Sequence, residues 1–455
     1  MTFSASLQIV YIMSSIESII QKYTQQGIHS VLTQFVDIHG VAKGKLVPIQ
    51  HLQQLVDTGA GFAGPSIWGT GLGRLGARSE YYGRVDLSTL RPLPFMPGVL
   101  HAVCSGYANQ QVLDTCSRQV LIRQVDKLKA KGWKFWVGIE PEFFLMKKNQ
   151  VGQWQVADSL DQLSKPSYDL KSIARNYGFI QELNQTLIEL GFNLEQTDHE
   201  DACGQYEINY AHDEVLAAAD RFILFKLAAH EIAQRHDMLF SCMPKPLANA
   251  PGSGLHFHIS ITDENNQPIF KNNQQALSLS DKGMQFAAGL LHHADALAAI
   301  CAPTVNSYKR LRVSESASGT TWSPVWKAIG DNNRTCLLRA VSGRLEWRLP
   351  DPSCNVYAAL AATIAAGLEG IEQQMPAPSI CEEDLYERFA SQQAMPERLP
   401  NNLLTAIEAL AKDSTLKTRL GETFCEQLIE IKRQEWDEYA EQISNWELQT
   451  YCDKF

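Results

Sequence analysis

Hydrophobic and polar positions follow two different periods along the 455-residue chain. Alternation at every second residue over residues 31–49, on either side of Asp-Ile-His-Gly, predicts a β-hairpin, because successive strand residues point to opposite faces. The apolar run over residues 133–140 predicts a strand. Helical spacing predicts helices over residues 14–26, 52–56, 117–131, 177–190, 215–235, 283–300, 357–374, 404–410 and 422–443. The length and this order of elements predict a small mixed domain over residues 14–108 and a large one over residues 109–455.

Functional side chains gather on the segments that we interpret as strands. Four short segments, far apart in the chain, carry acidic, His or Arg side chains close together: Glu140 and Glu142, Glu200 and Glu207, His256 and His258, and Glu346 and Arg348. Residues two apart on a strand share one face, so such pairs would lie side by side above a sheet. Five carboxylates and two imidazoles held together would repel one another unless cations compensated them. Carboxylates in the majority favour Mg²⁺ or Mn²⁺ over Zn²⁺.

Each pair alone also has a purely structural interpretation. Two His residues at the end of an apolar run are often structural, and Glu346 with Arg348 is compatible with a cross-strand ion pair. Glu140 and Glu142 are harder to explain in that way, because they follow a strongly apolar run, and Pro141 between them predicts a bulge or an edge strand. The conjunction of the four segments is what favours a metal and phosphate site.

Composition narrows the class of protein. The net charge of −10 and the absence of a basic run argue against a nucleic-acid surface. Ten cysteines are scattered singly without a CxxC pair, which predicts reduced thiols in a cytoplasmic protein. The first 15 residues lack the basic region of a signal peptide, and we interpret Met13 as a candidate initiator. The Ala-rich run from Ala358 is too short for a membrane span and predicts a buried helix.

Nucleotide-binding loops of the common kinds are not predicted. Gly59, Gly61 and Gly64 match the glycine spacing of a dinucleotide-binding loop, but the segment before them is polar and helical in pattern. The chain contains no Walker P-loop motif, so an ATP site would need another architecture.

Seven segments together resemble, in order, the motifs of the glutamine synthetase family: FVDIHGVAKGK, GIEPEFF, HEDACGQYEI, GSGLHFHIS, VNSYKRL, NNRTCLLR and RLEWRLPDP. They are most similar to the short type III group, which includes glutamate–methylamine ligases. The resemblance implies an α+β fold, with a small β-grasp N-terminal domain and a large catalytic domain that has a curved antiparallel sheet and flanking helices. It also implies ATP as co-substrate, two or more Mg²⁺ or Mn²⁺ ions, and a homo-oligomer, a dodecamer of stacked rings with active sites between neighbouring subunits.

The same resemblance assigns roles to individual residues. One metal ion would be held by Glu142, Glu200 and Glu207, and a second by Glu140, His256 and Glu346. Nucleotide, glutamate and phosphate contacts would come from nearby motifs: His258 and Ser260 beside ATP, Arg310 with Gly252 and Arg348 at glutamate, and Arg334, Arg339, Arg344 and Arg348 facing phosphates. Arg339 and Arg344 also remain compatible with ordinary surface ion pairs.

The chain departs from the family pattern around the amine. Ala63, in the segment FAGPSI with Ser66, stands where the family usually places an Asp at the ammonium site. The loop over residues 312–324 is longer than usual and contains Glu315, and Pro251 replaces the usual Asn before Gly-Ser-Gly. Loss of an anion from a cation cage weakens selection for bare ammonium and leaves room for a methyl group.

These observations predict an enzyme that joins the γ-carboxyl of L-glutamate to methylamine or a similar small amine, through γ-glutamyl phosphate, at the expense of ATP. Three alternatives remain: a glutamine synthetase that uses ammonia, a metal-dependent amidohydrolase, and a non-catalytic structural relative. Tyr386 lies in the region where some relatives carry a modifiable Tyr, but its surroundings favour an ordinary helix-face residue.

Overall fold

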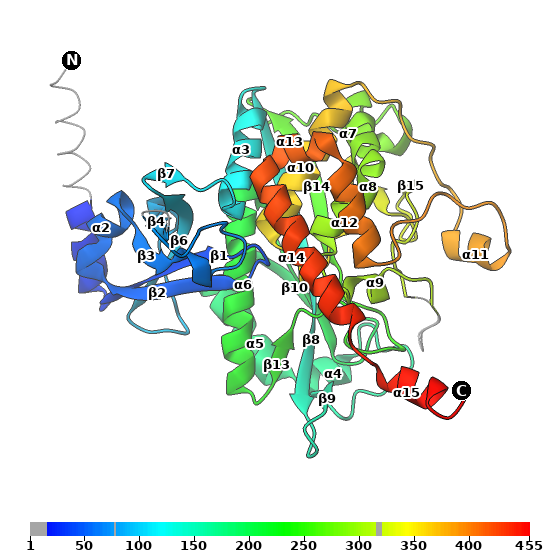
Figure 1. Ribbon diagram of the computed structural model, residues 1–455, viewed down its shortest axis with the longest axis horizontal. Coiled ribbons are helices and arrows are strands. Elements are labelled where there is room, and N and C mark those ends of the chain that lie inside the picture. The colour runs from blue at the N-terminus through cyan, green and yellow to red at the C-terminus, as the bar shows by residue number, and fades with distance from the viewer. Residues whose placement is uncertain (1–15, 77–78, 315–320) are drawn as a thin grey trace.

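The computed structural model describes residues 16–76, 79–314 and 321–455. Figure 1 shows a smaller region of strands at the N-terminal end, in blue, beside a larger body of helices and strands. Each region is built on its own sheet, so the α+β expectation is confirmed. Met13 and Glu315 lie outside the described residues.

The first sheet is seven-stranded, with the order β2-β1-β6-β4-β3 and two short strands paired to β6. The hairpin predicted over residues 31–49 is present, with β1 and β2 antiparallel. A helix over residues 16–25 and α2 (Leu52–Asp57) accompany this sheet and contribute Ile16 and Leu52 to its apolar core. The strands are β1 (Ser30–Val36), β2 (Ala42–Pro48), β3 (Ala60–Ala63), β4 (Glu80–Val85), β5 (Arg91–Pro92), β6 (Val99–Ala108) and β7 (Gln111–Val112).

The second sheet is ten-stranded, with the order β10-β11-β8-β14-β17-β16-β15 and β9, β12 and β13 paired to β8. All its pairings are antiparallel except β15 with β16, which is parallel. Its strands are β8 (Trp133–Lys148), β9 (Trp154–Val156), β10 (Leu194–His199), β11 (Gln205–Tyr210), β12 (Asp213–Glu214), β13 (Leu239–Ser241), β14 (Leu255–Asp263), β15 (Ile329–Asp331), β16 (Leu338–Val341) and β17 (Arg344–Trp347).

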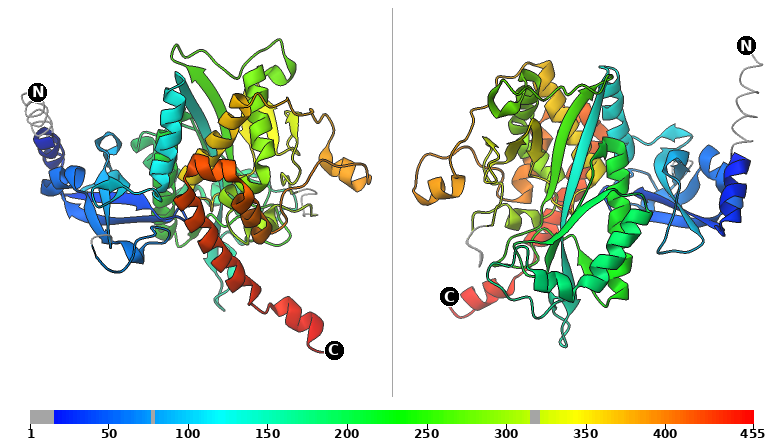
Figure 2. Two further views of the ribbon diagram at one scale, coloured as in Figure 1. Left: turned by 45° about the horizontal axis from the view of Figure 1, so that its top comes forward. Right: turned by 180° about the vertical axis from the view of Figure 1, so that it is seen from behind.

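Helices pack against this sheet and enclose a large apolar core. The bounds of α6 (Val215–Arg235) are those predicted, and the Ala-rich run forms α10 (Val356–Glu372), which is almost entirely buried, as expected. The other helices are α3 (Ser117–Lys129), α4 (Leu170–Arg175), α5 (Tyr177–Glu189), α7 (Asp281–His292), α8 (Ala294–Cys301), α9 (Ser307–Arg310), α11 (Leu385–Ala390), α12 (Leu403–Lys412), α13 (Ser414–Leu420), α14 (Glu422–Ala440) and α15 (Asn445–Tyr451). In Figure 2 the chain end with α15 extends away from the body. Among the described residues, no helix is both long and apolar enough to cross a bilayer.

Two local predictions were wrong, each for a physical reason. The helix predicted over residues 283–300 is broken at His293, whose buried ring lies 2.6 Å from Asp413 and 2.8 Å from Glu369. The bulge or edge predicted at Pro141 is not found, because β8 is a central strand. The Glu142 N–H donates to the Gly254 carbonyl, on the side of β8 where β14 lies. The backbone nitrogen of residue 141 therefore points to the opposite side, in the gap between the residues of β8 that pair with β12 and those that pair with β11. A proline, which has no N–H, is tolerated there because no ladder bond is lost.

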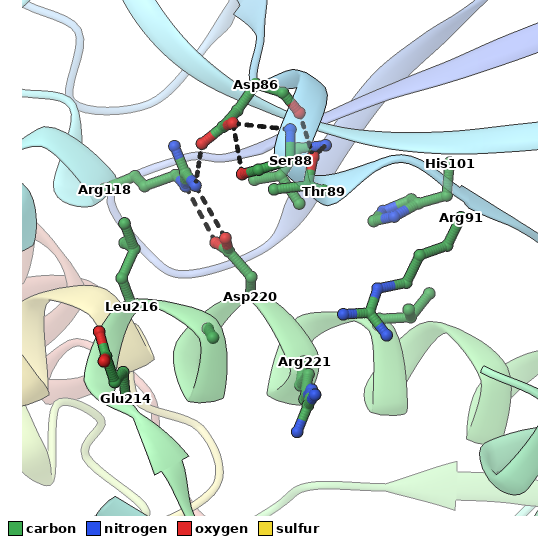
Figure 3. Close-up of a pocket in the computed structure, with 13 residues that line it drawn as sticks. Asp86, Ser88, Thr89, Arg91, His101, Arg118, Glu214, Leu216, Asp220 and Arg221 are labelled. Carbon is green, nitrogen blue, oxygen red and sulfur yellow. Dashed lines mark hydrogen bonds and ion pairs between the residues drawn. The ribbon is translucent and has the colours of Figure 1, made fainter. Parts of the chain in front are cut away.

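The two regions meet at a buried ion network beside a cavity of about 230 Å³ (Figure 3). The Arg118 guanidinium of α3 donates to both oxygens of Asp220 on α6, at 2.9 and 2.8 Å, and to Asp86 at 2.9 Å. Burial opposes its charge, but hydrogen bonds to Asp220 and Asp86 outweigh that cost and raise the pKa of Arg118. The junction is therefore held by a cation whose two anions are both in contact with it.

All ten cysteines are unpaired, which confirms the expectation of free thiols.

Candidate active site

The register of the second sheet brings the predicted groups into adjacent positions. On β8 and β14, Glu140 lies opposite His256, and on β11 Glu207 lies opposite Glu142. On the other side of β14, His258 lies opposite Glu346 of β17, which in turn lies opposite Arg339 of β16. The functional side chains of the four segments, joined by Arg339 of β16, thus form one continuous patch on the sheet. The prediction that residues two apart share one face of the sheet is confirmed for Glu140 with Glu142 and for His256 with His258.

A small cavity of about 50 Å³ opens beside this patch. Its lining combines carboxylates, guanidinium groups and glycine backbone: Glu142, Glu200, Asp201, Gln205, Pro251, Gly252, Gly254, His256, Arg310, Thr321, Trp322, Ser323 and Arg348. The strand β14 that bears the two His residues is central in an open sheet, with β8 and β17 as neighbours, which is not the barrel that an amidohydrolase would require.

Three overlapping groups of side chains bring ligand atoms within 4.8 Å of one another. They are Glu140 with His258 and Glu346, Glu140 with Glu207 and His256, and Asp198 with Glu200 and Glu207. The donors are mainly carboxylate oxygens with a minority of imidazole nitrogen, which suits a hard divalent cation. The residues present therefore fit the metal ions that the resemblance implies.

These groups differ from the two ligand sets expected from the sequence. His258, expected beside ATP, lies 2.9 Å from Glu140 and belongs to the first group. Asp198 was not predicted at all, although it stands two residues before Glu200 and so carries the same i, i+2 signal. Asp198 lies on β10, opposite Glu207 of β11, and so belongs to the patch.

Mutual repulsion of carboxylates is visible in one half of the site. Burial, and then the charge of Glu200, raises the pKa of Glu142 to about 8. Burial, and then Asp198, raises the pKa of Glu200 to about 7. Burial followed by the charges of Glu200, Glu140 and Glu142 raises the pKa of Glu207 well above its ordinary value. Without a compensating cation, Glu142 and Glu207 favour their protonated forms at neutral pH, and Glu200 is about half protonated.

The other half of the site is compensated by protein cations. Burial opposes the charge of Glu346, but Arg348 and then the two imidazoles outweigh it and lower the pKa of Glu346 to about 2. The Arg348 Nη1 and Arg339 Nη1 donate to its two oxygens at 2.6 and 2.7 Å. The ion pair that the sequence left as an alternative for Glu346 is thus present. Burial, and then Arg348, lowers the pKa of His256 to about 4, so its ring is neutral and able to bind a cation.

The predicted arginines divide into buried and exposed groups. Arg310 and Arg348 both line the cavity, and Arg310 donates to the carbonyls of Leu349 and Arg348 at 3.0 Å each. Arg344 is exposed, and its Nε donates to His258 Nδ1 at 3.1 Å. Arg334 is also exposed, and its charge is near enough to counter the rise in the pKa of Glu200.

Glycine backbone shapes the cavity wall. A Cβ atom at Gly252 would lie 2.3 Å from the Pro244 carbonyl, and one at Gly254 would lie 2.5 Å from His256 Nε2. The Gly254 N–H and the Gln205 side chain each donate to Glu142 Oε2 at 2.9 Å. Gly252 was predicted at the site; Gly254 and Gln205 were not, although both lie within the recognised motifs.

Not every predicted residue reaches the cavity of its own chain. Ala63 ends β3 in the first sheet, and Ser66 follows in a turn that lies instead beside Gln427 and Glu430 of α14. Ser260 is half-buried on β14, two residues beyond His258. Tyr386 of α11 is half-buried, and its hydroxyl donates to the Ser323 carbonyl at 2.9 Å.

The chain is similar to known proteins over almost its whole length. A family model described as the glutamine synthetase catalytic domain matches residues 114–451. The glutamate–methylamine ligase of Methyloversatilis universalis is 43% identical over 428 residues, covering 93% of this chain and 96% of that protein. The glutamine synthetase of Halobacterium salinarum is 36% identical over 444 residues, covering 94% and 95%.

Solved structures agree with the sequence relatives. A complex of the protein GmaS with ADP superposes with a TM-score of 0.89 at 36% identity, covering 95% of this chain and 99% of that one. GmaS without ligand superposes with a TM-score of 0.87 at 34% identity, covering 94% and 98%. These two superpositions cover 94% and 95% of this chain. The chain therefore belongs to the glutamine synthetase family.

Proposed function

We propose that the protein is an ATP-dependent ligase that joins the γ-carboxyl of L-glutamate to a small primary amine, with methylamine preferred over ammonia. The observation that carries the proposal is one cavity in which carboxylates and buried guanidinium groups from remote segments converge. The 43% identity to a glutamate–methylamine ligase supports the choice of amine, as does Ala63 in place of an acidic residue.

The chemistry explains why these groups are needed. A carboxylate is a poor electrophile, so amide formation requires that one of its oxygens first become a leaving group. Transfer of the γ-phosphoryl group of ATP to glutamate supplies this as γ-glutamyl phosphate, and the amine then displaces phosphate. Bound Mg²⁺ or Mn²⁺ would supply charge neutralisation of the phosphoryl oxygens. The metal ligands are proposed from the three groups, which comprise Glu140, Asp198, Glu200, Glu207, His256, His258 and Glu346, together with Glu142, which the family resemblance assigns.

The remaining side chains are proposed to bind and orient the substrates. Arg310, 6% exposed beside Gly252, is placed to bind a substrate carboxylate, and Arg348 is placed between Glu346 and the cavity. Arg334, Arg339 and Arg344 lie on the side of β16 and β17 and are proposed to face the phosphates, with Ser260 nearer the nucleotide. Burial of the reacting groups keeps water from the acyl phosphate.

The amine subsite is proposed to be completed by a second copy of the chain. Ala63 and Ser66 lie in the first sheet and do not line the acidic cavity of the same chain. A ring of subunits, with the first sheet of one copy against the catalytic sheet of the next, would bring them there. We therefore propose a homo-oligomer, a dodecamer of two rings.

An ADP-release assay tests the proposal. With glutamate and Mg²⁺ present, we expect release to depend on the amine, with a higher kcat/KM for methylamine than for ammonia. A large preference for ammonia would identify a glutamine synthetase instead. ADP release without any amine, or no release at all, would contradict a ligase.

The metal requirement is tested separately by thermal unfolding. Mg²⁺ or Mn²⁺ should raise the melting temperature by mass action, and a chelator should reverse the rise. The relative size of the two shifts would indicate the preferred ion.

A further inference from the structure

One aromatic side chain stands out in the cavity. Among the described residues that line it, Trp322 is the only large apolar one, and it lines the cavity together with Glu142, Glu200 and Asp201. Its side chain is 42% exposed, whereas most large aromatic rings of the catalytic region are buried. A partly exposed indole beside carboxylates is neither core packing nor an ordinary surface residue, so it calls for a functional explanation.

The backbone of Trp322 is held in an unfavourable conformation. Its φ angle is +53°, in the left-handed region that bulky residues rarely adopt. Such conformations persist only where the surrounding structure imposes them, and they are concentrated at ligand sites. The positive φ angle of Trp322 therefore indicates a functional position.

Hydrogen bonds on both sides of Trp322 impose that conformation. Before it, the buried Thr321 hydroxyl lies 3.4 Å from both the Arg312 carbonyl and the Tyr386 hydroxyl. After it, the buried Ser323 hydroxyl donates to the Arg310 carbonyl at 2.6 Å, and the Ser323 carbonyl accepts from Tyr386 at 2.9 Å.

The Trp322 carbonyl is itself tied to the site. It accepts from Arg348 Nη2 at 3.2 Å, and Arg348 also binds Glu346. The ring of Tyr386, which anchors both neighbours of Trp322, packs edge-on against the buried Trp326, with centroids 5.5 Å apart. The backbone at Trp322 is thus held by Arg348 on the cavity side and by Tyr386 of α11 on the other side.

We propose that Trp322 forms the apolar wall of the amine subsite and selects an alkylammonium over bare ammonium. The face of an indole attracts a cation, and an alkylammonium loses less hydration on reaching the ring than bare ammonium does and adds the apolar contact of its methyl group; the carboxylates across the cavity attract its N–H groups. Ammonium, which is fully hydrated and has no apolar surface, gains little from the ring. The inference rests on the proposed ligase function and assigns its amine specificity to one side chain.

The test exploits the positive φ angle. Trp322→Gly removes the ring but retains a backbone that glycine adopts readily, so the fold and the neighbouring hydrogen bonds should persist. We expect the ratio of kcat/KM for methylamine to kcat/KM for ammonia to fall by about 10-fold, chiefly through the KM for methylamine. Trp322→Phe retains an aromatic face and should keep most of the preference. Trp154→Ala removes an indole of similar exposure, 54%, on the β9 hairpin and should leave the ratio unchanged.

The outcomes separate the two proposals. If wild-type protein releases no ADP with either amine, the ligase function itself is wrong. If the wild type prefers methylamine but Trp322→Gly, with an unchanged melting temperature, keeps the same ratio, the assignment of Trp322 is wrong. A rise in the KM for glutamate alone would also overturn the assignment, because the indole would then contact glutamate rather than the amine.

Discussion

Two buried clusters of charge in this protein are built on opposite plans. At the domain junction, Arg118 contacts Asp86 and Asp220 directly, and each carboxylate has its cation within hydrogen-bonding distance. In the catalytic sheet, Glu142, Glu200 and Glu207 adjoin one another, and their pKa values are raised by burial and by their own charges. The junction supplies its own counter-charge, whereas the cavity leaves it to a ligand.

The difference between the two clusters distinguishes charged groups that stabilise the fold from charged groups that bind a ligand. A buried charge that only holds the fold together is paired, because an unpaired one destabilises the protein. Repelling carboxylates remain in a fold only where something outside the chain compensates them, at least while the protein works. Within the acidic patch the same contrast recurs, since Glu346 is paired with Arg348 and Arg339, whereas the pKa values of Glu142, Glu200 and Glu207 are raised.

The largest expected effect comes from Glu142→Gln in the uncompensated cluster. With a pKa of about 8, Glu142 is mainly protonated at neutral pH when no cation is bound, so a neutral isostere should change the melting temperature little. Activity should fall by about 100-fold or more, because a charge that acts on the cation is lost. Thermal unfolding and ADP release on the same sample would measure both.

The control for this variant is the response to Mg²⁺. We expect the cation to raise the melting temperature of the wild type more than that of Glu142→Gln. A variant that is strongly destabilised without metal would show that Glu142 is structural and would break the comparison.

An intermediate effect is expected at the junction. Arg118→Met leaves two carboxylates without their cation and should lower the free energy of unfolding by about 3–5 kcal/mol. Catalytic parameters of the protein that remains folded should change far less. Urea unfolding monitored by circular dichroism would measure the loss.

Lys129→Met, on the same helix, is the matched control. Lys129 and Asp126 are 69% and 65% exposed and lie 4.0 Å apart, so the urea midpoint should hardly move. Equal losses in the two variants would contradict the role assigned to Arg118.

The smallest effect should come from His293→Gln, in a compensated cluster at the break between α7 and α8. Burial disfavours the imidazolium, but Asp413 and then Glu369 outweigh it and raise the pKa of His293. Burial also opposes the charge of Asp413, yet the bond to His293 lowers the pKa of that carboxyl. The substitution should lower the free energy of unfolding by about 1–3 kcal/mol at a pH where His293 and Asp413 are both charged.

The stability contributed by the His293–Asp413 pair should depend on pH. A raised His pKa contributes stability that is full below its unfolded value and is lost as pH rises through the folded value. A lowered Asp pKa contributes stability that is lost as pH falls through the folded value. The difference in melting temperature between wild type and His293→Gln should therefore be largest near pH 5–6 and shrink towards about pH 9. A difference independent of pH would show that the ring acts only by packing.

Local periodicity alone was sufficient for several elements and for the pairs of functional side chains that share a face. The bounds of α6, the β1–β2 hairpin and the buried α10 follow from the spacing of apolar residues, which depends only on neighbours within a few positions. The two-residue spacing of Glu140 with Glu142 and of His256 with His258 similarly determines that each pair shares a face.

Only the tertiary structure decided how those pairs combine. Which residue of β10 lies opposite which residue of β11, and which of β17 lies opposite β14, depends on the register of strands whose residues are far apart in the chain. That register added Asp198 and placed His258 beside Glu140 and Glu346. The break at His293 depends on contacts with Glu369 of α10 and with Asp413 between α12 and α13, and the backbone at Trp322 depends on contacts with α11. No local pattern encodes these contacts. Periodicity determines the face on which a side chain lies, whereas long-range packing determines which side chains it meets there.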